Sequence, residues 1–185
     1  SFVSGDRKKE GILPNLSIYE NLVVPLYKKT SRGGFLGFVD WLELNGIFDW
    51  EVDRLSIKTG PRDNLIGSLS GGNQQKVMIA RSFAQHPKVL ILNDPARGID
   101  VSTKRDLYTH LRNYVEEGNT VVFLSSELEE FIGLCPKVMV FRNGTVFDIF
   151  ENEKVNADTL LEGMFGQTAG IGETSISSKS NTPLM

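Results

Sequence analysis

The segment best suited to chemistry is residues 69–76, with the sequence Leu-Ser-Gly-Gly-Asn-Gln-Gln-Lys. Ser70 is typical of a helix N-cap, and Gly71 and Gly72 would leave backbone N–H groups with no side chain in front of them. The unpaired amides and the positive end of the helix dipole together favour an anion, most often a phosphate oxygen. An ordinary Ser-capped helix after a Gly-Gly turn has the same local pattern, so the segment alone leaves both interpretations open.

Three further polar segments follow along the chain, two of them directly after an apolar run. They are Asn93-Asp94-Pro95 after residues 89–92, Arg-Gly-Ile-Asp at 97–100, and Ser-Ser-Glu at 125–127 after residues 120–124. Such short apolar runs are typical of strands buried on both faces of a parallel sheet. The four segments fall in a fixed order along the chain.

The elements that would position these segments alternate between strand and helix. A capping box of Ser17 and Glu20 opens one helix, which Pro25 kinks or shortens. The other expected elements are a strand end at 2–4, helices at 35–49, 70–86, 102–117, from 126 and at 158–165, strands at 89–92 and 120–124, and a hairpin of 138–141 with 145–150. This order predicts an α/β fold with a mostly parallel sheet core.

Packing roles follow from the same pattern. Leu107, Leu111 and Val115 form the expected inner stripe of their helix. The aromatic residues of 35–50 are predicted to be core, with an interface as the alternative. A Gly-Gly pair at 33–34 should break the chain, and Asn143-Gly144 should turn the hairpin. Cys135, the single cysteine, precludes an intramolecular disulfide and is expected to pack rather than react.

Composition narrows the function classes. The chain has 185 residues, a net charge of -3 and 40% hydrophobic residues, enough for a real core in one domain with or without a tail. It has no basic tract suited to nucleic acid or anionic lipid, and no apolar run near the roughly 20 residues of a membrane helix. No signal peptide is expected.

The four segments, in their order and spacing, resemble the ATP-binding subunit of ABC transporters. Residues 69–76 resemble the signature motif, 89–94 the Walker B strand and 98–100 the D-loop, while Ser126 stands at the position of the switch histidine. The Asn-Gln-Gln form, the Arg-Gly-Ile-Asp turn, and Asp6-Arg7-Lys8 followed by Gly11 are similar to the second cassette of the double-cassette ATPases of monosaccharide importers.

The resemblance implies a partial ABC-type nucleotide-binding domain over residues 1–165. A helical signature subdomain would occupy about 12–86, the Walker B, D-loop and switch region about 87–150, and a disordered tail 166–185. In the family, two cassettes sandwich ATP head to tail. Ser70, Gly71, Gly72 and Asp100 would therefore act on ATP and Mg²⁺ held by a partner cassette. Gln74 is either a further nucleotide contact or an exposed residue of the first helical turn.

The same resemblance implies the wider assembly. It includes transmembrane permease subunits and a periplasmic sugar-binding protein, with this chain peripheral to the cytoplasmic face of the bacterial inner membrane. The charged residues 6–10 are either a contact with the membrane subunit or a solvated loop. The sequence does not identify the sugar that such an importer would carry.

Several residues depart from the family pattern. Asn93 stands at the Mg²⁺ position, where a hard cation prefers a carboxylate. Asp94 stands at the position of the catalytic glutamate and is one C–C bond, roughly 1.5 Å, shorter. Ser126 replaces the switch histidine, as is usual in this branch, and Gly5 stands where the branch commonly has glutamate. These changes predict a half that is deficient in hydrolysis.

The phosphate-binding loop Gly-x-x-x-x-Gly-Lys-Ser/Thr is absent from the sequence. The family places it upstream of the position of Ser1, so truncation is expected, and the chain alone should bind ATP poorly. Three hypotheses remain open. The chain is a non-catalytic coupling half, a working ATPase half with Asp94 as base, or a solitary interaction module or gene remnant.

Overall fold

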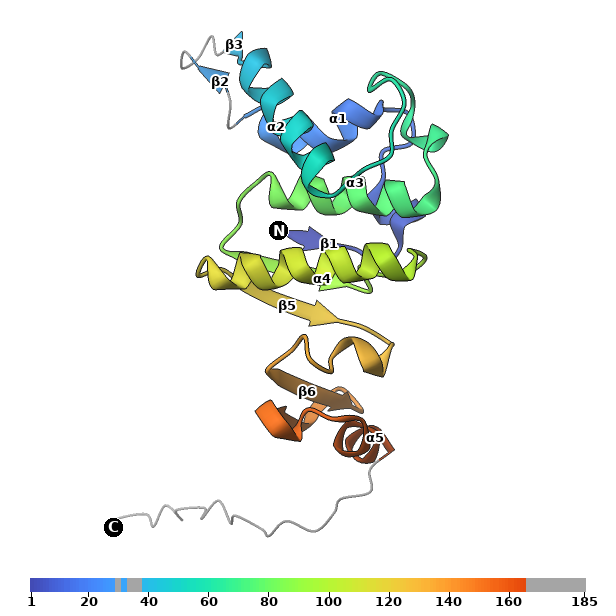
Figure 1. Ribbon diagram of the computed structural model, residues 1–185, viewed down its shortest axis with the longest axis vertical. Helices are drawn as coiled ribbons and strands as arrows, with labels where there is room; N and C mark the ends of the chain where they lie inside the picture. Colours follow the sequence, from blue (N-terminus) through green and yellow to red (C-terminus); the bar gives the residue numbers. More distant parts are fainter. Residues whose placement is uncertain (29–30, 33–37, 166–185) are drawn as a thin grey trace, which may run out of the picture. The chain divides into compact units, whose positions relative to one another are not determined.

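A computed structural model describes residues 1–28, 31–32 and 38–165 (Figure 1). The predicted break at 33–34, the start of the aromatic segment at Phe35 and the predicted disordered tail at 166–185 lie outside the described residues. The chain divides into two compact units, Ser1–Glu127 and Leu128–Met185, and each is described by itself.

A three-stranded parallel sheet forms the centre of the first unit. Its strands are β1 (Phe2–Val3), β4 (Val89–Asn93) and β5 (Thr120–Leu124), in the order β1-β4-β5. Phe2 pairs with Ile91, and Ile91 pairs with Val122. The helix α4 (Val101–Glu116) connects β4 to β5 as a parallel crossover requires. The predicted α/β fold with a parallel sheet is therefore confirmed.

The two faces of this sheet differ in how far the described residues cover them. Val3, Leu90 and Leu92 are buried on the face that contacts α3 (Gly71–Phe83) and α4. On the opposite face, Phe2 is 58% exposed and Ile91 37% exposed. The prediction that these strands are buried on both faces was therefore wrong, because an apolar run reports the character of the side chains and not which elements pack against them.

Three helices pack on one another in the same unit. They are α1 (Ile18–Val23), α2 (Trp41–Arg54) and α3. Both halves of the predicted capping box are present at α1, where the Ser17 hydroxyl accepts from the Glu20 N–H and the Glu20 carboxylate accepts from the Ser17 N–H. A 3-10 turn containing Pro25 follows α1 directly, so the predicted shortening is confirmed. A short antiparallel pair, β2 (Ser31–Arg32) and β3 (Phe38–Val39), precedes α2.

The aromatic segment differs from its prediction. The α2 helix begins at Trp41, with Asp40 as its N-cap, and not near Phe35. Phe48 is buried as expected, but Phe38, Trp41 and Trp50 are 81%, 57% and 66% exposed. The core prediction was therefore wrong for most of these rings, because aromatic content does not reveal which face of a helix is covered.

The inner stripe of α4 is also partly corrected. Leu107 and Leu111 are buried as predicted, but Val115 is 48% exposed and Tyr114 takes the buried position. The ring of Tyr114 packs edge-on against Phe83 of α3, with centroids 5.3 Å apart. A step of four followed by a step of three spans two turns of the 3.6-residue period more closely than two steps of four.

The second unit is built on a hairpin of β6 (Lys137–Arg142) and β7 (Thr145–Glu151) with α5 (Ala157–Phe165). Asn143 and Gly144 both have positive φ, at 50° and 77°, as the predicted tight turn requires. Cys135 packs against the core of Val138, Val155 and Leu160, and its burial raises the pKa of the thiol. The predicted packing role is therefore confirmed.

The helix expected from Ser126 is only a 3-10 turn, Leu128–Glu130. Gly133 has a φ of 73°, and Pro136 follows soon after, so the chain leaves the helical path within a few residues. That prediction was wrong.

No helix among the described residues is both long enough and apolar enough to span a bilayer.

One buried acidic side chain stands out in the helical part. Glu51 of α2 is 1% exposed, and its Oε1 lies 3.4 Å from Nη1 of Arg54. Its Oε2 has no hydrogen-bond partner among the residues that the structure describes. The Arg54 guanidinium lies over the Phe83 ring at 4.3 Å. Burial raises the pKa of the Glu51 carboxyl from 4.5 to about 7, and Arg54 offsets this only in part.

Glu51 should make folding dependent on pH. The folded state keeps its proton up to about pH 7, while the unfolded state releases it near 4.5. Stability is therefore fully present at low pH and falls as pH rises through this window, by as much as about 3 kcal/mol. We expect Glu51→Gln to remove this dependence in urea unfolding across the window. A difference between the variant and the wild type that stays constant with pH would contradict it, and exposed Glu116→Gln is the control.

Candidate anion site at the start of α3

The start of α3 has the predicted capped form. The Ser70 hydroxyl accepts from the Asn73 side-chain amide at 3.0 Å and from the Asn73 N–H at 3.5 Å. Ser70 is exposed, and Gly71 and Gly72 are half-buried. A helix end of this kind offers unpaired N–H groups together with the positive end of the helix dipole.

The same helix end borders an open hollow of about 450 Å³. Ser70 and Gly72 line it together with Asp100 at the start of α4. The hollow also contains two cations, Lys58 and Lys76. The remaining lining residues are Ser56, Asn73, Ser102, Thr103 and Asp106. Tertiary structure thus brings together the predicted signature and D-loop residues, which lie about 30 positions apart in sequence.

Lys58 and Lys76 were not predicted from the sequence as residues of the site. The Lys58 N–H donates to Oδ1 of Asn73 at 2.9 Å, and Nζ of Lys76 donates to the Ser56 carbonyl at 3.0 Å. These bonds attach the segment after α2 to the start of α3. Lys76 ends the signature segment and could have been suspected, but no motif marks Lys58.

Asp100 is the N-cap of α4. Its carboxylate accepts from the Ser102 hydroxyl at 2.5 Å and from the Thr103 N–H at 3.0 Å and hydroxyl at 2.8 Å. These bonds, Ser102 first, hold the pKa of Asp100 well below its usual range. Asp100 is therefore an ionised, exposed carboxylate that its own helix end keeps in place.

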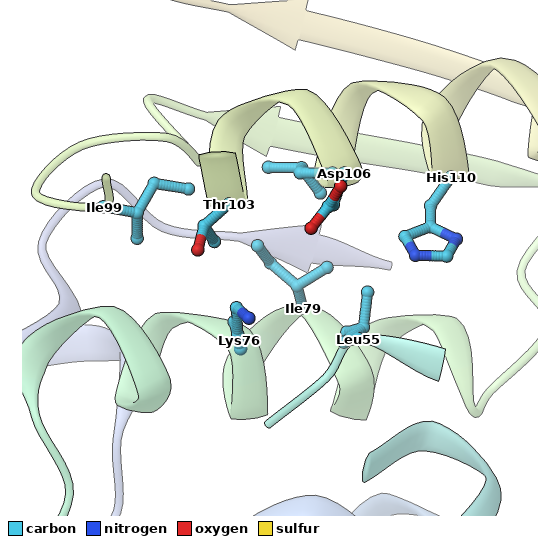
Figure 2. A pocket seen from close by; sticks show the side chains of 8 residues that line it. Leu55, Lys76, Ile79, Ile99, Thr103, Asp106 and His110 are labelled. Carbon is cyan, nitrogen blue, oxygen red and sulfur yellow. The ribbon is translucent and has the colours of Figure 1, made fainter. Parts of the chain in front are cut away.

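A narrow space separates α3 from α4 beside this hollow. Figure 2 shows Thr103, Asp106 and His110 extending from α4, opposite Lys76 and Ile79 of α3. Its volume of about 10 Å³ is room for one water at most. The two helices are thus packed against each other here, and the space is not a ligand site.

Asp94 and Ser126 meet at the carboxyl edge of the sheet. Oδ1 of Asp94 accepts from the Ser126 N–H at 2.9 Å, with the Ser126 hydroxyl at 3.4 Å. The N–H of Asp94 donates to the Leu124 carbonyl at 2.8 Å, and Asp94 has a φ of 43°. The positions predicted for the base and the switch are therefore in direct contact, and the carboxylate already has a donor.

Gly5 lies against Asn93 at the same edge. A Cβ added at Gly5 would be 3.2 Å from the Asn93 carbonyl oxygen and 3.3 Å from Nδ2. Both distances are shorter than ordinary van der Waals contact. Gly5 and Asn93, which both depart from the pattern expected from the sequence, are thus neighbours in space. A side chain at position 5 would crowd Asn93.

The residues at this edge do not make a magnesium site by themselves. Asn93 supplies only a neutral amide oxygen, and the Asp94 carboxylate is bound to Ser126. Among the residues that the structure describes, no three His, Cys, Asp or Glu side chains are grouped to hold a metal ion. The donor set therefore does not fit Mg²⁺, which prefers carboxylate oxygens.

Gln74 points back towards its own loop. Its Nε2 donates to the Leu69 carbonyl at 3.0 Å and to the Ile66 carbonyl at 3.4 Å, and the residue is half-buried. In this arrangement it steadies the turn before α3. A contact with nucleotide stays a prediction.

Comparison with known proteins gives the family and the fold. Residues 4–97 match the family model described as ABC transporter, which is half of the chain. The chain belongs to the ABC transporter family. The fold agrees, since an ATP-binding cassette, MJ0796, solved as a dimer bound to ADP and Pi, superimposes with a TM-score of 0.70. That match has 22% sequence identity and covers 81% of this chain and 61% of the cassette.

Two curated relatives are ribose import ATP-binding proteins. A ribose import ATP-binding protein RbsA of Bacillus cereus is 37% identical over 162 residues, which cover 87% of this chain and 32% of the relative. RbsA 1 of Mesorhizobium japonicum is 38% identical over 146 residues, 79% of this chain and 28% of the relative. This cassette chain thus spans about a third of the length of the relatives it matches.

The Gly5 contact can be tested by stability. We expect Gly5→Ala to lower the free energy of unfolding by about 1 kcal/mol, because its Cβ must displace the backbone of β4. Gly67→Ala is the matched control, since no atom of the described residues lies within 4 Å of a Cβ there. The control should be neutral or slightly stabilising. Equal urea midpoints for the two variants would show that the sheet edge accommodates the side chain.

Proposed function

We propose that this chain is one cassette of an ATPase that drives monosaccharide import, and that it presents its signature helix end to ATP held by a partner cassette. The observation that carries the proposal is the hollow shared by Ser70, Gly72 and Asp100. A capped helix N-terminus aimed at a γ-phosphate supplies fixed positive dipoles where negative charge develops. Phosphoryl transfer depends on that kind of stabilisation.

We also propose that the chain's own site is deficient in hydrolysis. A general base must be free to accept a proton from the attacking water. Asp94 instead accepts from the Ser126 backbone, and the neighbouring Asn93 offers no carboxylate. A side chain at position 5 would lie too close to Asn93. These contacts support a coupling role, in which ATP and Mg²⁺ are bound largely by the partner.

The proposed partners are a second cassette, permease subunits and a periplasmic sugar-binding protein, at the cytoplasmic face of the bacterial inner membrane. The support is the similarity to ribose import ATP-binding proteins. The exposed rings of Phe38 and Trp41, with exposed Leu42 beside them, supply apolar area for a protein contact.

An active half is the second candidate, because Asp94 retains a carboxylate directly after β4. Magnesium-dependent turnover that survives inactivation of the other cassette's Walker A loop would favour it. A solitary module is the third. An intact native mass near 20.6 kDa with a cooperative melt would favour it, whereas a mass more than twice that value would favour a double cassette.

The test compares two substitutions in the assembled ATPase. We expect Ser70→Arg to abolish ATP hydrolysis, because the side chain and its charge fill the hollow at the start of α3. Asp94→Ala should change the rate by less than about twofold, since a deficient half loses no base. Ser68→Arg, an exposed serine two residues earlier, controls for bulk and charge. If Asp94→Ala were as damaging as Ser70→Arg, the coupling-half proposal would be abandoned.

A further inference from the structure

The loop at residues 5–11 packs closely along α3. A Cβ added at Gly11 would lie 2.2 Å from Cε of Met78, and Nη2 of Arg81 donates to the Gly11 carbonyl at 2.5 Å. Asp6 caps the turn Arg7–Gly11 by accepting from the Lys9 N–H. These contacts hold the backbone of the loop in place beside the helix.

That placement sets Arg7 against the first residue of α3. A Cβ added at Gly71 would lie 2.9 Å from Nη2 and 3.4 Å from Cζ of Arg7. The guanidinium therefore occupies space beside Gly71 that a side chain would otherwise fill. Glycine at this position admits the cation as well as exposing the N–H groups.

The charge of Arg7 is uncompensated among the described residues. It forms no ion pair within 1–28, 31–32 and 38–165, and its Nε is buried with no hydrogen-bond partner. The acids of its own loop are engaged elsewhere, Asp6 with Lys9 at 3.8 Å and Glu10 with the Ser4 hydroxyl at 2.5 Å.

The position is electrostatically unfavourable without an anion. The start of a helix carries a partial positive charge, so a cation placed there is repelled. A buried guanidinium nitrogen with no acceptor adds a desolvation cost. Phosphate oxygens placed at the helix end would offset the repulsion, because guanidinium matches the geometry of phosphate.

We propose that Arg7 is a phosphate-binding residue of the signature site, which adds a formal charge to the helix N–H groups that face the partner's nucleotide. This inference rests on the proposed function, since it needs nucleotide at the start of α3. A purely structural role, in which Arg7 only fills space beside Gly71, is the alternative that the experiment must separate.

The experiment measures kcat and KM for MgATP hydrolysis by the assembled ATPase carrying Arg7→Ala, Arg7→Lys, Lys88→Ala or Ser70→Arg in this chain. We expect Arg7→Ala to raise KM about tenfold, the size of one lost charge-assisted bond, with kcat changed less than twofold. Arg7→Lys should restore most of the loss, because a cation remains. Lys88→Ala removes one exposed charge at the opposite, amino end of β4 and should change neither constant.

A structural role has a different signature. If Arg7 only packed, Arg7→Ala would leave fewer folded molecules and lower kcat at unchanged KM, and lysine would not rescue it. That result would overturn the inference. Repeating the assay at about 0.1 M and about 1 M salt adds an independent readout, since the ratio of KM between Arg7→Ala and wild type should shrink as charge is screened. An unchanged ratio would also count against it.

Ser70→Arg separates the two proposals. If it abolishes hydrolysis while Arg7→Ala changes neither constant, the inference about Arg7 fails and the signature role stands. If Ser70→Arg has no effect on hydrolysis, the proposed function fails, and the inference fails with it.

Discussion

The parallel pairing of β1, β4 and β5 is the constraint on which the site depends. Because parallel strands end at one edge, pairing of Val3 with Leu92 and of Asn93 with Leu124 sets the segments after all three strands side by side. Gly5 then meets Asn93, and Asp94 meets Ser126. A shift of register by one residue would turn these side chains to the other face and dissolve both contacts.

The second requirement is that α3 and α4 begin near one another. Close packing of the two helices leaves room for one water at most between them, so their N-terminal ends open into the same hollow. The capping residues Ser70 and Asp100 thereby act in local structure and also border a shared surface. Stability and proposed function use the same groups here, which is why substitutions at the caps must be judged by catalytic constants and by folding together.

Charged side chains in the first unit, Ser1–Glu127, are unevenly neutralised. Lys104 and Glu127 pair at 2.6 Å, and Lys9 lies near Asp6, as surface ions usually do. Glu51 and Arg7 differ, since each has a buried polar atom with no hydrogen-bond partner among the described residues. Glu51 lies in the helical core, and its raised pKa indicates that it holds a proton there. The proton removes the cost of burying a charged carboxylate. Arg7 lies instead beside the start of α3, and none of the described carboxylates pairs with it.

Local chemistry in the sequence determined the caps at Ser17 and Ser70, the turn at Asn143 and Gly144, and the strand-helix order. Each depends on neighbours within a few residues, so pattern alone sufficed. Tertiary structure decided which apolar faces are covered, so that Ile91, Val115 and Trp50 are exposed against expectation. It also decided the contacts of Arg7 with Gly71 and of Asp94 with Ser126, since such contacts arise only when distant segments pack, and spacing along a chain carries no record of that.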